Sequence, residues 1–275
     1  MFLIPPMIAL LANTLCYVLG KDYFLSNIIV FGGYFLMIFP FLDRKYIEQH
    51  WKTLTAFFAF STLSTTILEL IFIHTDTWAF SSQINHMVGI NIFGIPIEEF
   101  IFWEGCPLVV ISTYIYYKKL PATITVGEVA DAISGVETVV ETKEVTGDAI
   151  TNAEMFVDDL IVEDSDGLPS YFRGDKMPVY TMFVGFVIWS IFEMRDYASG
   201  NYKAIALTVL AFFFGIMPYE HYALLTHTWI YNMDKMTGIT LIGVPIEEWV
   251  IYFTCPTAGC LFLELFGTKL GNRLT

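Results

Sequence analysis

The hexapeptide Gly-Ile-Pro-Ile-Glu-Glu at residues 94–99 returns as Gly-Val-Pro-Ile-Glu-Glu at residues 243–248. Each copy lies at the head of a hydrophobic run that continues to a Cys-Pro pair, at 106–107 and at 255–256. Charged side chains inside apolar segments are costly, and where they occur they usually serve a function. The duplicated acid pair therefore marks a candidate functional site.

The hydrophobic runs around these motifs are long enough to cross a membrane. Of the 275 residues, 55% are hydrophobic and 17% aromatic, and the mean hydropathy is +0.59. Seven runs stand out, at residues 2–19, 24–42, 53–73, 93–117, 177–193, 203–225 and 241–266. Because backbone groups in lipid must be hydrogen-bonded internally, these runs should be helices. We predict an all-α, polytopic protein of the cell (plasma) membrane, with about seven transmembrane helices.

The duplication extends upstream of the acid pairs. Glu69 lies nine residues before Trp78, and Glu220 lies nine residues before Trp229. Each half is therefore predicted to be a three-helix repeat, and the first helix of the chain is additional. The expected divisions are a first membrane half at 1–118, an acidic polar linker at 119–176 and a second membrane half at 177–275.

Three helices per repeat is an odd number, which has a topological consequence. If the linker stays on one side of the membrane, the second repeat enters in the opposite sense and the halves are inverted repeats. The acids of the first half would then face one membrane side and those of the second half the other, so that each half serves one end of a long substrate. The alternative is a single cavity shared by both halves. Under this topology, eight Lys and Arg residues against five favour a cytoplasmic N-terminus and a cytoplasmic linker.

The linker carries most of the negative charge of the chain. Residues 119–176 hold thirteen acidic and four basic residues, a balance of −9 out of a net −14. We expect a solvated segment, with short helices around 127–141 and 152–162. An acidic surface of this kind argues against nucleic acid as a partner.

The local sequence indicates how the acids are arranged. A proline suits the first turn of a helix, and the helix dipole tolerates carboxylates there. The residues three, four and seven positions after each acid pair share its helical face, and the acids at 69 and 220 lie near the ends of the facing helices. We expect a cluster of three acids per half, walled by aromatic side chains. The candidate acids are Glu98, Glu99, Glu247, Glu248, Glu69 and Glu220, and the candidate substrate-binding residues are Phe102, Trp103, Tyr252, Trp78 and Trp229.

A simpler interpretation is that the acid pairs only cap their helices with solvated side chains. In the same way, Trp78 and Trp229 could belong to interfacial aromatic belts. Glu104 and Glu264 have no counterpart in the other half, so we treat them as peripheral.

Several kinds of chemistry lack an anchor in the sequence. There is no nucleotide-binding glycine motif, and the last hydrophobic run, 241–266, has no Lys for a retinal Schiff base. The five histidines do not cluster, and the four cysteines lack metal-ligand spacing. Asp158, Asp159 and Asp164 resemble a diphosphate-binding motif, but they lie in an acidic segment where such a string arises by composition. We therefore expect no cofactor and no metal.

Carboxyl groups among aromatic side chains point to proton-initiated chemistry. Two carboxyl groups in one apolar site do not both ionise readily, so one can stay protonated beside an ionised neighbour. Such a pair can protonate an alkene and later remove a proton. Aromatic faces can stabilise the intervening carbocation.

Duplicated Pro-x-Glu-Glu motifs in three-helix halves resemble the integral-membrane lycopene β-cyclase family. The resemblance rests on residues 96–99 and 245–248 and covers about 40–118 and 177–270. It implies redox-neutral closure of the ends of lycopene to β-carotene via γ-carotene. Acid and base would come from Glu98, Glu99, Glu247 and Glu248, supported by Glu69 and Glu220. It also implies a carotenoid substrate and the lipid bilayer as partners, and it makes other enzymes of the carotenoid pathway candidate partners. The long acidic linker departs from the family pattern.

Two other functions agree with the same features. One is the cyclisation or hydration of other carotenoids, or a prenyl transfer. The other is a non-enzymatic transporter, since inverted repeats with acids in the membrane are common there. Analysis of pigments after expression distinguishes these functions from lycopene cyclisation.

Overall fold

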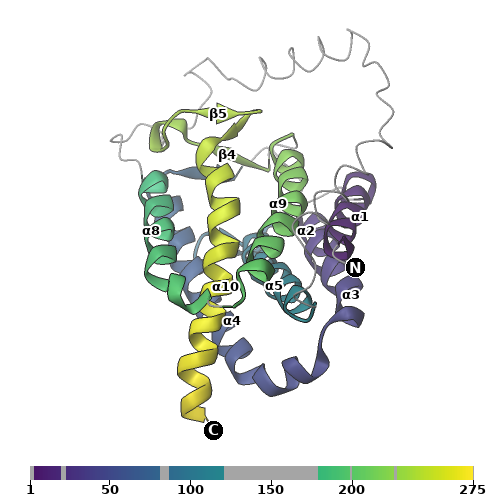
Figure 1. The fold of residues 1–275 in the computed structure, drawn as a ribbon. Helices are drawn as coiled ribbons and strands as arrows, with labels where there is room; N and C mark the ends of the chain where they lie inside the picture. The colour runs from purple at the N-terminus through teal and green to yellow at the C-terminus, as the bar shows by residue number, and fades with distance from the viewer. Residues whose placement is uncertain are drawn as a thin grey trace, which may run out of the picture.

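The computed structural model describes residues 3–19, 23–80, 87–120, 179–198, 200–225 and 228–274. The described chain is a bundle of helices with short strands at one end (Figure 1). Its helical segments are α1 (Ile4–Leu19), α2 (Tyr23–Asn27) continued through η1 (Ile28–Gly32), α3 (Gly33–Ile38) and η2 (Phe39–Phe41), α4 (Arg44–His74), α5 (Ile97–Lys118), α8 (Val179–Met194), η4 (Arg195–Ala198), α9 (Tyr202–Leu225), η5 (Met233–Lys235) and α10 (Ile246–Leu274). The seven predicted runs therefore all contain a helix. The helices predicted inside the linker, and the three aspartates at 158, 159 and 164, lie outside the described residues.

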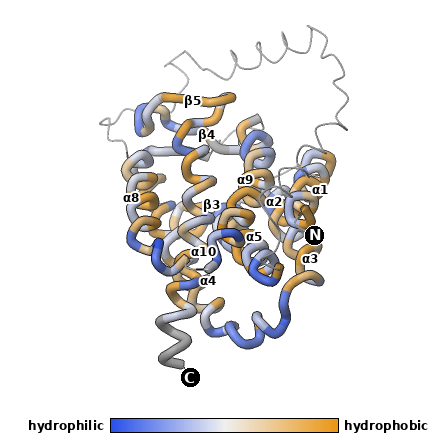
Figure 2. Tube along the Cα trace, in the orientation of Figure 1, coloured by the Kyte–Doolittle hydropathy of each residue, from blue (hydrophilic) through white to orange (hydrophobic). Residues whose placement is uncertain are grey.

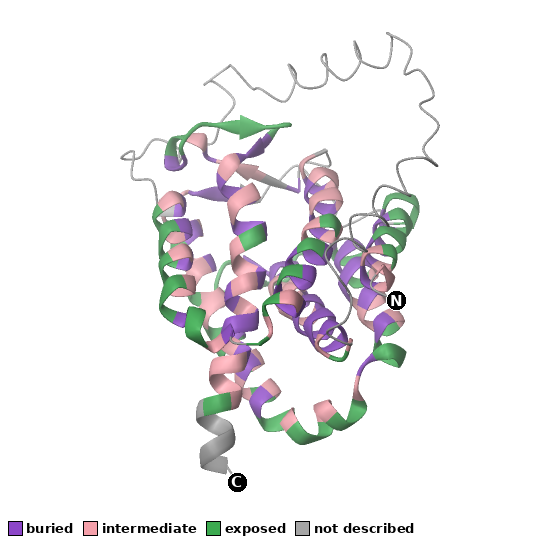
Figure 3. Cartoon of the chain, viewed as in Figure 1, coloured by how far each residue is buried: buried purple, intermediate pink, exposed green. Residues whose placement is uncertain are grey.

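Five of these helices are long and apolar enough to cross a membrane, namely Tyr23–Phe41, Arg44–His74, Ile97–Lys118, Tyr202–Leu224 and Ile246–Thr268. The helices α1 and α8 are shorter, at 16 residues each. Orange, apolar segments run through the bundle in Figure 2, and many outward-facing positions in Figure 3 are exposed. Exposed apolar side chains such as Leu63 (63%) and Phe214 (58%) suit a lipid environment. The chain is a multi-pass membrane protein.

Short strands, which the sequence did not predict, join the helices at one end of the bundle. They are β1 (Trp78–Phe80), β2 (Asn91–Ile92), β3 (Ile95–Pro96), β4 (Trp229–Tyr231), β5 (Thr240–Leu241) and β6 (Val244–Pro245). The pairs β2–β3 and β5–β6 are antiparallel hairpins that lead directly into α5 and α10. The predicted helices 93–117 and 241–266 thus each begin as a hairpin, and the helix starts immediately after the motif proline.

The turn of each hairpin explains this local structure. Phe93 and Gly94 have φ of 55° and 85°, and Ile242 and Gly243 have φ of 54° and 73°. Two consecutive residues with positive φ form the tight turn that matches the twist of a two-stranded hairpin. The glycine adopts this conformation without strain, whereas the residue before it adopts it at an energetic cost.

The pairing of β1 with β4 corrects the predicted inverted topology. These strands are equivalent in the two repeats, and they are antiparallel, with Trp78 opposite Tyr231 and Phe80 opposite Trp229. Such a self-complementary pairing places a pseudo-twofold axis between the central residues, Ala79 and Ile230. Both repeats therefore present their motif ends at the same end of the bundle.

The helix contacts show the same direction for the two repeats. At the motif end, the start of α8 meets the end of α4, since Tyr180 and Phe72 have ring centroids 5.4 Å apart. At the opposite end, Lys118 of α5 forms an ion pair of 2.6 Å with Glu264 of α10. Because α5 ends opposite the point where α8 begins, the linker joins opposite ends of the bundle. The premise that both linker ends lie on one side was wrong.

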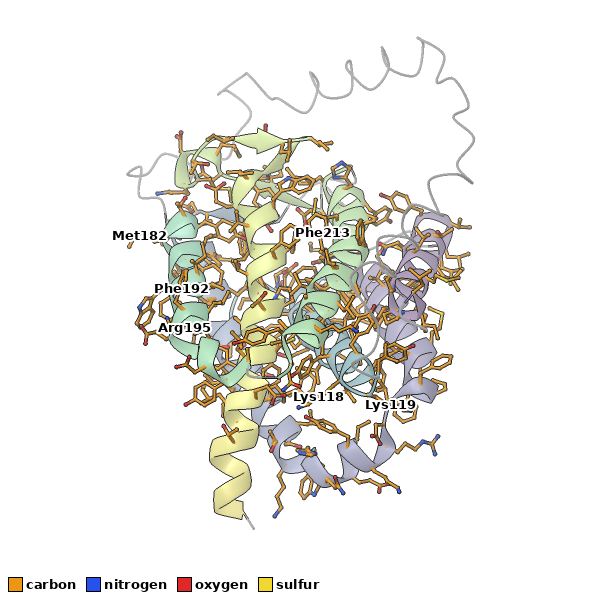
Figure 4. The ribbon with its side chains drawn as sticks, in the orientation of Figure 1. Lys118, Lys119, Met182, Phe192, Arg195 and Phe213 are labelled. Carbon is orange, nitrogen blue, oxygen red and sulfur yellow. The ribbon has the colours of Figure 1, made fainter. Side chains whose placement is uncertain are left out.

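The corrected topology redistributes the basic residues. Ten Lys and Arg residues are in the described part of the chain, and nine lie toward the end where α5 finishes: Arg44, Lys45, Lys52, Lys118, Lys119, Arg195, Lys203, Lys269 and Arg273. Three of these, Lys118, Lys119 and Arg195, are labelled in Figure 4. Lys235 lies at the motif end, in η5, where it is buried.

A glycine lets the first repeat pack tightly. A Cβ atom at Gly105 of α5 would lie 2.3 Å from Cγ of Phe31, so no other residue fits without movement. Phe31 belongs to the π-helical turn η1, which interrupts the helix that begins at Tyr23. Small residues at helix contacts allow such close approach in membranes. The contact brings the start of that helix, with its polar side chains, against the motif of α5.

Candidate functional site

The six candidate acids are buried at the motif end of the bundle. Their exposed fractions are 4% or less, and Glu98 and Glu220 are at 0%. The pairs at 98–99 and 247–248 lie in the first turns of α5 and α10, as the sequence predicted. The simpler interpretation, that these acids are solvated caps, does not fit this burial.

Two indole groups hold Glu69. Trp78 donates its Nε1–H to Glu69 Oε1 at 3.0 Å, and Trp103 donates its Nε1–H to Oε2 at 3.0 Å. An indole nitrogen can only donate, so both carboxyl oxygens act as acceptors, as in an ionised carboxylate. Trp78 is 8% exposed, so it is a buried partner of Glu69 and not part of a lipid-facing belt.

Two phenol groups hold Glu220 in the same way. Tyr231 donates to Glu220 Oε1 at 2.8 Å, and Tyr252 donates to Oε2 at 2.5 Å. Tyr252 occupies the position of Trp103 in the repeat. Desolvation raises the pKa of Tyr231, in the β4 strand, well above its ordinary value, and the Glu220 carboxylate raises it further. This phenol therefore stays protonated and donating at neutral pH.

The second acid of each pair also binds a tyrosine. Tyr23 at the start of α2 donates to Glu99 Oε1 at 2.6 Å, and Tyr180 at the start of α8 donates to Glu248 Oε1 at 2.5 Å. These two tyrosines begin the first helix of each repeat, so they occupy equivalent places. The sequence analysis did not identify them, although an apolar helix that begins with a tyrosine in both halves was a visible signal.

The first acid of each pair has one bound and one unpartnered oxygen. Glu98 Oε1 accepts the backbone N–H of Val88 at 2.5 Å, and Glu247 Oε1 accepts that of Thr237 at 2.6 Å. Thr181 Oγ1 also donates to Glu247 Oε1 at 3.0 Å. In both residues, Oε2 is buried and has no hydrogen-bond partner among the described residues. Buried polar atoms are rarely left unsatisfied, and a matched pair of them calls for an explanation.

The acids of the two halves form one cluster. The Glu99 carboxyl group interacts electrostatically with Glu69 of its own half and with Glu220 of the other, and Glu248 interacts with Glu220. Cys106 and Cys255, which follow the two motifs, are close enough to interact with each other. The sequence placed three acids in each half and left open whether they form one site or two, and these interactions join acids of both halves.

A polar contact between the halves supports the first motif. Asn27 donates its Nδ2–H to the backbone oxygen of Glu98 at 3.0 Å, and Tyr219 of α9 donates to Asn27 Oδ1 at 2.5 Å. Both residues are buried. Asn27 immediately precedes the π-helical turn η1, and such turns often occur at functional sites. The sequence analysis did not identify either residue.

The remaining aromatic candidates have different surroundings. Phe102 is buried, stacks on Tyr219 with a centroid distance of 6.1 Å, and meets Trp103 edge to face at 5.4 Å. The Trp103 ring is partly buried. The backbone of Trp229 lies in β4, and its side chain is outside the described residues. Of the two acids treated as peripheral, Glu264 lies at the far end of the bundle and binds Lys118 and Tyr114.

The arrangement can hold protons and negative charge in an apolar setting. Two carboxyl oxygens are available to carry a proton, and two other carboxylates are fixed by donors on both oxygens. Aromatic rings of α4, α5, α9 and α10 surround them. Such a site can protonate a hydrocarbon and stabilise the cation that results.

Comparison with known protein families gives one match in two parts. The family model described as "Lycopene cyclase" matches residues 4–117 and 177–266. The two parts contain both acid motifs and leave out the linker. No curated protein and no solved structure matches the chain significantly.

Proposed function

The chain belongs to the lycopene cyclase family, and from this premise we propose that it is a lycopene β-cyclase that converts lycopene to β-carotene through γ-carotene. In this reaction, a carboxylic acid donates a proton to the terminal double bond of the polyene. The resulting cation is attacked by a neighbouring double bond, which closes the ring. A carboxylate then removes a proton and leaves the ring double bond, so substrate and product are isomers. No electrons are exchanged.

We assign the proton donors to Glu98 and Glu247. The observation that carries this assignment is their matched, buried and unpartnered Oε2 atoms. A proton on such an oxygen has no competing acceptor among the described residues, so it is available to an alkene. The backbone N–H groups of Val88 and Thr237 hold the other oxygen and thereby orient the carboxyl group.

The other four acids share the negative charge of the site. Glu69 and Glu220 have donors on both oxygens, which favours the ionised form and fixes its position. A carboxylate that is already oriented stabilises a developing cation without reorganisation. In this proposal, Glu69, Glu99, Glu220 and Glu248 stabilise the cation and accept the departing proton, and Phe102, Trp103, Tyr252, Trp78 and Trp229 form the walls.

The proposal includes the setting of the enzyme. We keep the division into membrane halves at 1–118 and 177–275 and the linker at 119–176, and we place the enzyme in the plasma membrane beside other carotenoid-pathway enzymes. Basic residues favour the cytoplasmic side of a membrane, and nine of the ten described ones lie opposite the motif end. The acid cluster would then open toward the non-cytoplasmic side. Labelling of a cysteine at Asp196 from the cytoplasmic side only would support this orientation, and labelling from outside would reverse it.

Expression in a lycopene-accumulating host tests the function directly. The wild type should convert lycopene to β-carotene, as measured by chromatography of the pigments. E98Q and E247Q should each abolish ring formation, while the control E48Q, at an exposed position of α4, should leave it unchanged. Unchanged β-carotene from both E98Q and E247Q would refute the assignment. Hydroxylated or prenylated pigments, or ion flux without pigment change, would indicate the alternative functions.

A further inference from the structure

A groove opens between α4 and α5 and reaches the Glu69 carboxylate. Counted with the space that is open to the outside, it has a volume of about 200 Å³, and it is lined by Thr65, Thr66, Glu69, Ile95, Phe100, Trp103 and Glu104. Leu63 and Ile67 of α4 are exposed, at 63% and 50%, so this part of α4 faces the outside of the bundle.

The threonine hydroxyl groups of the groove already donate hydrogen bonds within α4. Thr65 donates its hydroxyl to the backbone oxygen of Ser61 at 2.8 Å, and Thr66 donates to that of Thr62 at 2.7 Å. Because these protons are bound within the helix, the wall offers hydrocarbon-compatible surface. The Glu104 carboxyl group of α5 lies near Thr62 of α4, whose hydroxyl donates to the backbone oxygen of Phe58 at 2.9 Å.

In the second half, aromatic side chains of the described residues stand at the equivalent place. The repeat aligns Thr62 with Phe213, Phe100 with Trp249, and Glu104 with Phe253. Phe213 and Phe253 stack with centroids 4.3 Å apart, and Phe213 contacts Trp249 at 5.7 Å. In Figure 4, Phe213 projects from α9 beside α10. Three aromatic rings therefore fill the space that is a groove in the first half.

We propose that the α4–α5 groove is the lateral route by which the end of a linear polyene passes from the bilayer to the acid cluster, and that the aromatic stack closes the corresponding route in the second half. The proposal rests on the proposed function. It assigns Thr62, Thr66, Phe100 and Glu104 to substrate access. The acyclic end of the polyene therefore enters through the first half.

Transplanting the stack tests this route. The double variant T62F/E104F introduces the second-half residues and should lower the initial rate of lycopene cyclisation in vesicles by about tenfold or more, since a bulky ring blocks the approach to the acids. The matched control L63F adds the same ring at the neighbouring exposed position and should keep the wild-type rate. F213A/F253A removes the natural stack and should keep at least half of the wild-type rate. A wild-type rate in a folded T62F/E104F would overturn the proposal.

Chemical closure of the groove keeps the test valid if T62F/E104F misfolds. T62C is made and folded, then reacted with a bulky maleimide, with L63C and the wild type treated in parallel because the four native cysteines are buried or partly buried. Labelled T62C should lose activity while labelled L63C and treated wild type keep theirs. Full activity of labelled T62C refutes the route. An inactive untreated wild type instead refutes the proposed function, so the two failures are distinguishable.

Discussion

The two halves hold the same carboxylate with different chemistry. In the first half two indoles bind Glu69, and in the second half two phenols bind Glu220. An indole N–H only donates, whereas a phenol both donates and accepts. In the first half, the two groups bound to Glu69 can therefore only donate hydrogen bonds. In the second half, the two phenols bound to Glu220 can also accept, so a proton can be passed between them and the carboxylate.

The supports of the two acid pairs differ as well. In the first half, the backbone of Glu98 is held by Asn27, which in turn is held by Tyr219 of the other repeat. In the second half, Thr181 binds the carboxyl group of Glu247 itself. Duplication thus kept the positions of the acids and changed what surrounds them. The two halves are better regarded as two parts of one site than as two copies of a site.

The strongest test of this view compares E98Q with E247Q by product rather than by rate alone. If the six acids act together, each variant should lose about 10²–10⁴-fold in rate, the usual contribution of a general acid, and should form neither ring. Chromatography would show unchanged lycopene. Monocyclic γ-carotene as the final product of either variant, with no β-carotene after long incubation, would mean that each half serves its own end of the substrate.

The indole–phenol difference predicts unequal effects for E69Q and E220Q. A glutamine places an NH₂ donor against one of the bound groups. At position 69 this donor faces an indole donor, whereas at position 220 the phenol can rotate and accept. An unsatisfied buried donor costs about 1–3 kcal/mol, so E69Q should be less active than E220Q by about tenfold or more.

Initial rates and the thermal unfolding of both proteins in detergent measure this difference. E193Q, at an exposed position of α8, is the control and should match the wild type. Equal losses for E69Q and E220Q would show that the identity of the donors does not matter.

A smaller effect, on stability, is expected from the residues that hydrogen-bond to Glu98 and Glu247. N27A removes the hydrogen bonds of Asn27 to Glu98 and to Tyr219, both of them buried, so it should lower the unfolding free energy by about 1–3 kcal/mol. T181A removes one of two donors to Glu247 and should lower it by about 1 kcal/mol. Y219F combined with N27A in a double-mutant cycle measures their coupling. Additive effects would show that the contact between the halves carries no energy.

The smallest effect concerns pH. Because the pKa of Tyr231 is raised above its ordinary value of 10.0, folding holds this proton more tightly than the unfolded chain does. Its contribution to stability is therefore complete below about pH 10 and is lost only as the pH rises through the higher folded value. Between about pH 6 and 9, wild type and Y231F should differ in stability by a constant amount. A difference that changes within this range would mean that Tyr231 ionises there.

The helices and the acid motifs could be predicted because their signals are local. Long apolar runs give helices in lipid, and a Pro-x-Glu-Glu string gives a helix start with two acids in its first turn. The hairpins before α5 and α10 have a weaker sequence signal, because the turn residues Phe93-Gly94 and Ile242-Gly243 lie in apolar runs that are equally compatible with a helix. In each run, the glycine was the residue that indicated a turn.

The relation between the halves could not be predicted, because it depends on contacts between residues far apart in the chain. The inverted topology followed from counting helices and assuming the course of the linker. The β1–β4 pairing, which spans about 150 residues, overturns it. The tyrosines at 23, 180 and 231 were missed for a related reason, since their acidic partners lie 76, 68 and 11 residues away.

Under the proposed function, the β1–β4 pairing also governs how a substrate with two identical ends is processed. With all six acids at one end of the bundle, the enzyme meets one end of the polyene at a time. A half-finished molecule must withdraw, turn around in the bilayer and return, in competition with every unreacted molecule. Catalysis is then distributive, and γ-carotene should accumulate as a free pool before β-carotene appears.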